Sequence, residues 1–115
     1  MIVRRVFRFE AAHRLPHHPG KCRELHGHSY RLVVAVERPV EAASGMAIDF
    51  GDLKEIVRRE VVDRADHRSL NDLLDNPTAE MIAAWAWERL APHLAGLTEI
   101  ELWETDDCSV VYRGA

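Results

Sequence analysis

Cysteine is scarce in this chain of 115 residues, and long apolar runs and an excess of positive charge are missing. The two cysteines, Cys22 and Cys108, are too few for a disulfide framework, which favours reduced thiols in a cytoplasmic protein. There is no run of about 18 apolar residues and no apolar signal-peptide core at the N-terminus, so neither a membrane partner nor secretion is expected. The formal net charge of −4 argues against a nucleic-acid partner, which usually requires a basic face.

Internal repeats, low-complexity segments and a Gly-rich dinucleotide fingerprint are also absent. The apolar content of 47% and charged content of 30% are ordinary for a globular protein. The length fits one domain with one core, so residues 1–115 are expected to form a single domain.

Histidine, in contrast, recurs at the ends of two alternating segments. Residues 2–13 alternate as a half-buried strand that ends in His13, and residues 26–38 form a second strand in which His26 and His28 lead an apolar row. If the two strands are antiparallel, all three histidines meet at one end of a hairpin. Three convergent imidazoles with a water molecule describe an open zinc site, although His13 taken alone also fits a core histidine bonded to the backbone.

Two later segments carry apolar residues at helical spacing, and we expect helices at 50–63 and 77–95. Asn76 and Pro77 fit an N-cap followed by proline at the first helical position, and Gly96 fits a C-terminal stop. The two apolar stripes are Phe50, Leu53, Ile56, Val57 and Val61, and then Ile82, Trp85, Ala86, Leu90 and Leu94.

The C-terminal part alternates again, which predicts a hairpin of strands at 97–104 and 108–113. Cys108 is in register with apolar residues and is expected to be a small core residue. Glu104 continues an apolar row, so two interpretations remain open. Its carboxylate points inward, which requires a partner or a ligand, or the strand has ended and the side chain is solvated.

The order of elements, strand-strand-helix-helix-strand-strand, predicts an α+β fold. We expect a four-stranded antiparallel sheet with two helices on one face. Such a sheet has two edges to protect, and pairing of edges between subunits would protect them, so a homo-oligomer is expected.

Five motifs, in this order along the chain, resemble the 6-pyruvoyltetrahydropterin synthase family. They are Phe9-Glu-Ala-Ala-His13-Arg-Leu, Cys22-x3-His26-Gly-His28, Asp66-His67-x2-Leu70-Asn71, Asn76-Pro77-Thr78-Ala79-Glu80 and Glu104-Thr105. The resemblance implies a tunnelling fold (T-fold), in which subunits join their sheets into a barrel. It also implies a homohexamer, a dimer of trimers, with active sites at the subunit interfaces.

The same resemblance implies a role for each matching residue. The implied zinc ligands are His13, His26 and His28. The implied catalytic residues are Cys22, Asp66, His67 and Glu104. The implied substrate-binding residues are Glu104, Thr105, Thr78 and Glu80.

Within this scheme Cys22 is the base or proton carrier, and Asp66 and His67 form a charge relay with it, His67 being supplied by a neighbouring subunit. Glu104 anchors the guanidine-like edge of a pterin. The implied substrate is 7,8-dihydroneopterin triphosphate, and the implied cofactor is Zn²⁺.

The gap of three residues between Cys22 and His26 is similar to the branch that makes 6-carboxy-5,6,7,8-tetrahydropterin for queuosine. The pyruvoyl-forming branch usually has a longer gap, and 6-pyruvoyltetrahydropterin synthase activity is the main alternative. A second alternative is a zinc-binding module without catalytic activity.

Overall fold

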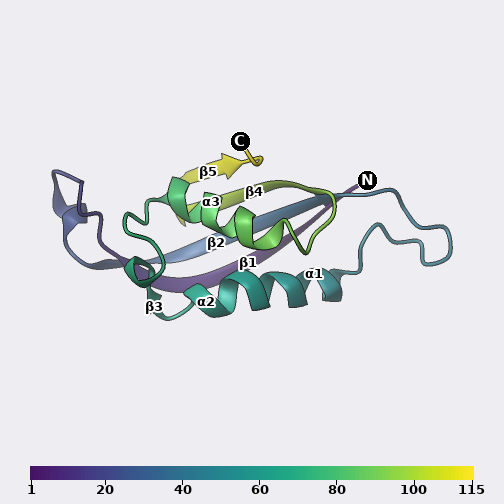
Figure 1. Cartoon of the computed structure of the whole chain (residues 1–115), viewed down its shortest axis with the longest axis horizontal. Coiled ribbons are helices and arrows are strands. Elements are labelled where there is room, and N and C mark those ends of the chain that lie inside the picture. The colour runs from purple at the N-terminus through teal and green to yellow at the C-terminus, as the bar shows by residue number, and fades with distance from the viewer.

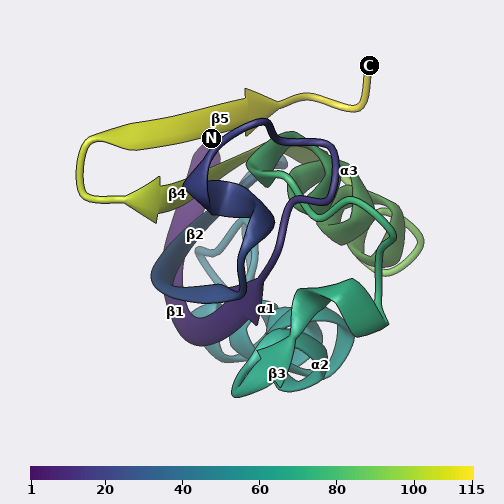
Figure 2. The same cartoon turned by 90° about the vertical axis from the view of Figure 1, so that its left-hand side faces the viewer.

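The computed structural model describes residues 1–115 as one sheet with helices on one of its faces (Figures 1 and 2). The strands are β1 (Ile2–His13), β2 (His26–Glu37), β3 (Arg68–Ser69), β4 (Leu97–Thr105) and β5 (Cys108–Tyr112). The sheet order is β3-β1-β2-β4-β5, so the α+β architecture is confirmed, but the sheet has five strands. The fifth, which the predicted four-stranded sheet did not include, is β3, a short parallel strand beside the end of β1.

The β1–β2 hairpin carries the three histidines of the predicted site. Its register pairs His13 with His26 as the last residues before the connecting loop, and Ala11 with His28. Residues of β1 from Phe7 onwards alternate between exposed and buried, and Phe9 on the buried face stacks on Tyr30 of β2 with ring centroids 5.0 Å apart. The predicted inward rows of both strands are therefore confirmed.

The first helical segment is longer and less regular than predicted. It comprises α1 (Phe50–Val57), a π-helical turn η2 (Arg58–Val62) and α2 (Asp63–Ala65). Asp49 is the N-cap, and its carboxylate accepts hydrogen bonds from the first turn. Phe50, the first residue of α1, is 61% exposed, so its predicted place in the apolar stripe that faces the core is wrong.

A buried carboxylate, Glu60, connects this π turn to the second helix. Glu60 is only 7% exposed, and its two carboxylate oxygens accept hydrogen bonds from Arg89 at 2.9 Å and from Arg59 at 3.0 Å. Arg89 also donates to the Glu60 main-chain carbonyl at 2.9 Å. Every oxygen of Glu60 thus has a guanidinium partner, and we call these three residues the Glu60 cluster.

The second helix, α3 (Ala79–Leu90), is shorter than the predicted 77–95. Its N-cap is Thr78, whose hydroxyl accepts from the Met81 amide at 3.2 Å, so the predicted cap at Asn76 is wrong. α3 ends at Leu90 with Ala91 as its C-cap, so the prediction of Gly96 as the C-terminal stop is wrong. Gly96 lies in the turn before β4 with a φ of 85°, and a side chain there would collide with the Glu37 carbonyl.

The β4–β5 hairpin contains an irregularity that places Glu104. Trp103 pairs with Ser109 and Thr105 pairs with Cys108, which leaves Glu104 as the extra residue of a β-bulge. A bulge redirects a side chain, and here it directs Glu104 toward the ends of β1 and β2. Cys108 is exposed, so its prediction as a core residue is wrong, because the sheet ends at β5 and no element covers that position.

The face of the sheet opposite the helices has no second layer (Figure 2). It carries polar pairs such as Arg113–Glu99, with a nitrogen–oxygen distance of 3.0 Å, and Ser29–Glu10, at 2.6 Å. β3 covers only Ala11 and Ala12 of β1, so most of that strand has no partner on its outer side. None of the helices is both long enough and apolar enough to span a lipid bilayer.

Candidate functional site

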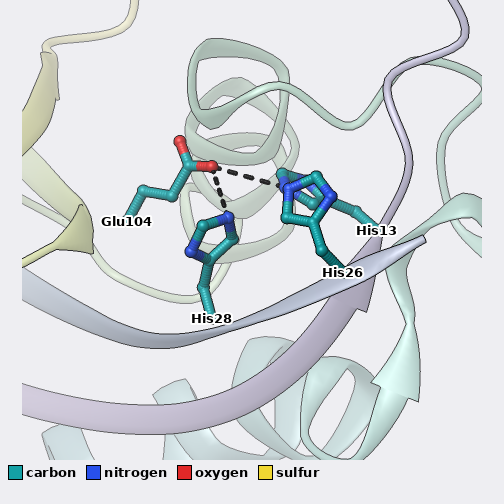
Figure 3. A group of neighbouring side chains, drawn as sticks. All are labelled: His13, His26, His28 and Glu104. Carbon is teal, nitrogen blue, oxygen red and sulfur yellow. Dashed lines mark hydrogen bonds and ion pairs between the residues drawn. The ribbon is translucent and has the colours of Figure 1, made fainter. Parts of the chain in front are cut away.

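Four side chains from three strands converge at the end of the β1–β2 hairpin (Figure 3). They are His13 from β1, His26 and His28 from β2, and Glu104 from the bulge in β4. One donor atom from each residue lies within 4.8 Å of every other. We call this group the His/Glu cluster.

The distances within the His/Glu cluster are close to those of a metal shell. The Nε2 atoms of His13 and His26 are 3.0 Å apart, and Glu104 Oε1 lies 2.9 Å from His28 Nε2 and 3.3 Å from His13 Nε2. Donors about 2.0–2.1 Å from a tetrahedral metal ion are roughly 3.3 Å from one another.

The other ring nitrogens explain why the Nε2 atoms are free. His13 Nδ1 donates to the Pro77 carbonyl at 2.8 Å, and His26 Nδ1 donates to the Glu24 carbonyl at 2.8 Å. A carbonyl only accepts, so each Nδ1 carries a proton, and in its neutral form each ring presents an Nε2 lone pair to the cluster. Two such lone pairs 3.0 Å apart repel each other unless a cation lies between them.

The donor set therefore fits a metal ion. Three imidazoles and one carboxylate are ligands that divalent transition metals accept, and the backbone carbonyls orient two of the rings. His28 Nε2 is buried and has no well-aligned hydrogen bond, although Glu104 is close enough for an ion pair. A buried nitrogen without a hydrogen-bond partner, such as His28 Nε2, is consistent with a metal ligand.

The charge of Glu104 dominates the electrostatics of the cluster. Its hydrogen bond with His13, together with the charges of His28 and His13, holds the pKa of Glu104 below its usual value despite burial. Burial disfavours the charged form of both His13 and His28. It lowers the pKa of His28, whereas bonds to Glu104 and Pro77 raise the pKa of His13. Glu104 is thus an ionised carboxylate that faces the ring nitrogens, and the inward interpretation of Glu104 is confirmed.

Tyr30 contacts the His13 ring from the buried face of β2. The sequence predicted it only as part of the apolar row, so this contact was missed. It is fully buried, and its hydroxyl lies 3.3 Å from His13 Nδ1. Burial and the nearby Glu104 charge raise its pKa, so the hydroxyl keeps its proton. The carbonyls of Pro77 and Glu24 were also missed, because side-chain identity does not reveal which main-chain carbonyl a folded loop presents.

Asp66 and His67 lie elsewhere, on the outer side of β1. Asp66 Oδ2 is 3.0 Å from His67 Nδ1, and Asp66 Oδ1 accepts the Glu10 amide at 2.9 Å. That backbone hydrogen bond, followed by those with His67, lowers the pKa of Asp66 below its usual value. His67 has a φ of 58°, unusual for a residue with a side chain, and is exposed beside a hollow of about 420 Å³. The predicted Asp66–His67 pair is present, but within one chain it does not join the His/Glu cluster.

Cys22 lies half-buried in the loop between β1 and β2, in a short 3₁₀ turn (Lys21–Arg23). Its carbonyl accepts the Leu15 amide at 2.7 Å, which closes the loop, and its thiol is not among the convergent donors. This placement agrees with the expectation that Cys22 is not a metal ligand.

The remaining predicted residues have local roles. Thr78 caps α3, Glu80 is exposed in its first turn, and Thr105 donates to Asp107 at 2.8 Å. Their predicted contacts with a substrate stay predictions.

Comparison with known proteins assigns the chain to a family. Residues 2–115 match the family described as 6-pyruvoyl tetrahydropterin synthase. A Synechocystis sp. protein named 6-carboxy-5,6,7,8-tetrahydropterin synthase is 46% identical, over 90% of this chain and 86% of the relative. A Pyrococcus furiosus protein named dihydroneopterin monophosphate aldolase is 40% identical, over 96% of each chain.

The fold comparison agrees. The structure of Caenorhabditis elegans 6-pyruvoyl tetrahydropterin synthase superposes with a TM-score of 0.92 at 29% identity, covering 100% of this chain and 96% of the other. The predicted T-fold is therefore confirmed. With strands, helices and the His/Glu cluster in place, the match over residues 2–115 shows that this chain belongs to the 6-pyruvoyl tetrahydropterin synthase family.

Proposed function

We propose that the protein is a zinc-dependent lyase of queuosine biosynthesis. It converts 7,8-dihydroneopterin triphosphate and one water molecule to 6-carboxy-5,6,7,8-tetrahydropterin, acetaldehyde and triphosphate. The observation that carries the proposal is the convergence of three histidines at the end of a hairpin whose loop holds Cys22. The three-residue gap before His26 and the similarity to the Synechocystis protein favour this branch.

The His/Glu cluster binds the reacting part of the substrate in this proposal. Zn²⁺ held by His13, His26 and His28 supplies Lewis-acid stabilisation of negative charge that develops on the hydroxylated side chain of the substrate. Glu104 accepts hydrogen bonds from the guanidine-like edge of the pterin, which fixes the orientation of the ring. Triphosphate leaves by elimination, and the redox change is internal to the substrate.

Proton transfer is the task of Cys22 and the Asp66–His67 pair. A free thiol has a pKa of about 8.5, and a nearby cation lowers it toward neutral pH. Asp66, whose pKa is lowered, contacts His67 Nδ1 at 3.0 Å and so orients the imidazole. General acid–base catalysis of this kind contributes about 10²–10⁴ in rate.

A homohexamer would bring the Asp66–His67 pair of one subunit to the His/Glu cluster of its neighbour. Asp66 and His67 lie on the outer side of β1, whereas Glu104 lies on the far side of β2, in β4. Both the outer side of β1 and β5 are open edges that a neighbouring copy can pair with. Both cysteines are free thiols, which suits the cytoplasmic location expected for this protein.

The decisive experiment is incubation of the zinc-loaded protein with 7,8-dihydroneopterin triphosphate, followed by identification of the products. Stoichiometric acetaldehyde and triphosphate are expected. A pyruvoyl product without acetaldehyde would establish the main alternative instead, and an aldol cleavage product would match the Pyrococcus furiosus relative.

Two variants separate an enzyme from a zinc-binding module. Cys22→Ala and His67→Ala should each be inactive but retain zinc, and a mixture of the two, refolded together, should regain activity if each site combines residues of two subunits. If neither the wild type nor Cys22→Ala turns over substrate and chelation unfolds the chain, the module interpretation is correct.

A further inference from the structure

Glu104 has two possible partners that require the same carboxylate. One is the group of ring nitrogens, which Glu104 Oε1 approaches to 2.9 Å at His28 and 3.3 Å at His13. The other is the pterin edge in the proposed function. Two parallel N–H groups of that edge would pair with both carboxylate oxygens, as a guanidinium does.

Glu104 Oε1 lies as far from the ring nitrogens as two ligands of one metal ion lie from each other. The oxygen is as close to His28 Nε2 as the Nε2 atoms of His13 and His26 are to each other, at 2.9 Å and 3.0 Å. The β-bulge holds Glu104 in this direction, and its side chain is 25% exposed, so a ligand arriving from solvent can reach it.

We propose that Glu104 is the fourth metal ligand in the substrate-free protein, and that a bound pterin removes it from the metal. The second half rests on the proposed function. Because one carboxylate serves both partners, metal and pterin should oppose each other's binding, and this opposition is equal in both directions. When a pterin draws Glu104 away from the metal, a coordination position on the metal opens. Without a pterin, Glu104 occupies that position.

The first test measures zinc affinity by competition with a chelator. Glu104→Gln should bind zinc at least about tenfold more weakly than the wild type, since loss even of an indirect partner of a metal site costs about 10–100-fold. Glu101→Gln is the matched control. It removes the same charge from the same strand, but Glu101 accepts a hydrogen bond from Ser109 on the other side of the hairpin, so zinc affinity should not change.

The second test uses 6-methylpterin, which has the guanidine-like edge but no side-chain hydroxyl that could bind the metal. In the wild type, saturating 6-methylpterin should weaken zinc binding by about fivefold or more, and zinc should weaken 6-methylpterin binding, followed by its fluorescence, by the same factor. In Glu104→Gln, 6-methylpterin should leave the zinc affinity unchanged.

Two results would overturn the inference. They are equal zinc affinity of Glu104→Gln and the wild type, or 6-methylpterin that binds the wild type without weakening zinc. The wild-type measurement needs no variant, so it stands even if Glu104→Gln folds poorly. If the protein fails to turn over 7,8-dihydroneopterin triphosphate while the opposition persists, the proposed function is wrong but the role of Glu104 is supported.

Discussion

The protein contains two buried polar groups of opposite character, the His/Glu cluster and the Glu60 cluster. In the Glu60 cluster each carboxylate oxygen and the main-chain carbonyl receives a guanidinium hydrogen bond of 2.9–3.0 Å. In the His/Glu cluster acceptors face acceptors, because the Nδ1 protons of His13 and His26 are committed to carbonyls. The first group is complete within the chain, whereas the second has the donor set of a metal site.

The difference shows how to separate function from stability in a single chain. Both groups contain a largely buried carboxylate with nitrogen partners, so the presence of a buried acid does not by itself identify the site. The balance of donors and acceptors does, because a network with too few protons is costly unless it binds something. We therefore expect changes in the His/Glu cluster to affect activity and changes in the Glu60 cluster to affect stability.

The largest effect is expected for His26→Ala. It removes one of the three imidazoles, so zinc should be lost and activity should fall by about a thousandfold or more, the several kcal/mol that a Lewis acid contributes. The circular dichroism spectrum should stay that of the wild type, because His26 is only half-buried at the end of β2. Metal analysis and turnover measure the result, and an unfolded variant would contradict the separation.

Arg89→Met should have the opposite profile. It leaves Glu60 Oε1 and the Glu60 main-chain carbonyl without a donor, while Arg59 still donates to Oε2, so the melting temperature should fall by several degrees while zinc affinity is unchanged. The double variant Glu60→Met/Arg89→Met removes both charges and should recover much of the loss. Reduced zinc binding by Arg89→Met would show that the two groups are coupled.

Acid should weaken the Glu60 cluster in a defined direction. The hydrogen bond from Arg59, with the charges of His93, Arg89 and Arg59, lowers the pKa of Glu60 below its usual 4.5 despite its burial. A group with a depressed folded-state pKa stabilises the protein above its unfolded pKa, and this is lost as pH falls through the folded value. Urea midpoints of the wild type and Glu60→Gln, measured from about pH 6 to about pH 3, should therefore converge on acidification. A constant difference would show that the ionised carboxylate is not the stabilising form.

The smallest effect is expected for Tyr30→Phe. The hydroxyl makes only a 3.3 Å contact with His13 Nδ1, which already donates to Pro77 at 2.8 Å. Zinc affinity should fall by no more than about tenfold, the lower end for partners that orient a metal ligand. Chelator competition measures this, with Tyr112→Phe, on the last strand, as the control for loss of a hydroxyl. A larger loss would mean that Tyr30, rather than Pro77, fixes the His13 ring.

Alternation in β1 and β2 was sufficient to predict that His13, His26 and His28 meet. A period of two leaves no freedom about which face a residue occupies once the hairpin is formed. The same alternation assigns Glu104 to the inward face with Ile100 and Leu102, but the sequence left open whether the strand extends that far, because its regular pairing ends there in a bulge.

Helix ends and strand edges were predicted less well. Asn76 is a good capping residue, but Thr78 two positions later caps α3, and its neighbour Pro77 instead presents its carbonyl to His13. Phe50 and Cys108 follow apolar periodicity, yet both lie where the second layer ends. Periodicity describes one element at a time, whereas burial depends on how far the opposing layer extends.

The register of the β1–β2 hairpin places the cluster where a bound metal would also hold the connecting loop closed. His13 and His26 are the last paired residues before the loop that carries Cys22. A metal that binds both would therefore cross-link the two ends of that loop, as a disulfide would. The Leu15 amide, bonded to the Cys22 carbonyl at 2.7 Å, reports on this cross-link through its rate of hydrogen exchange. If the proposed metal is bound here, its removal should let the loop and the Cys22 thiol move away from the histidines, which would appear as faster exchange of the Leu15 amide.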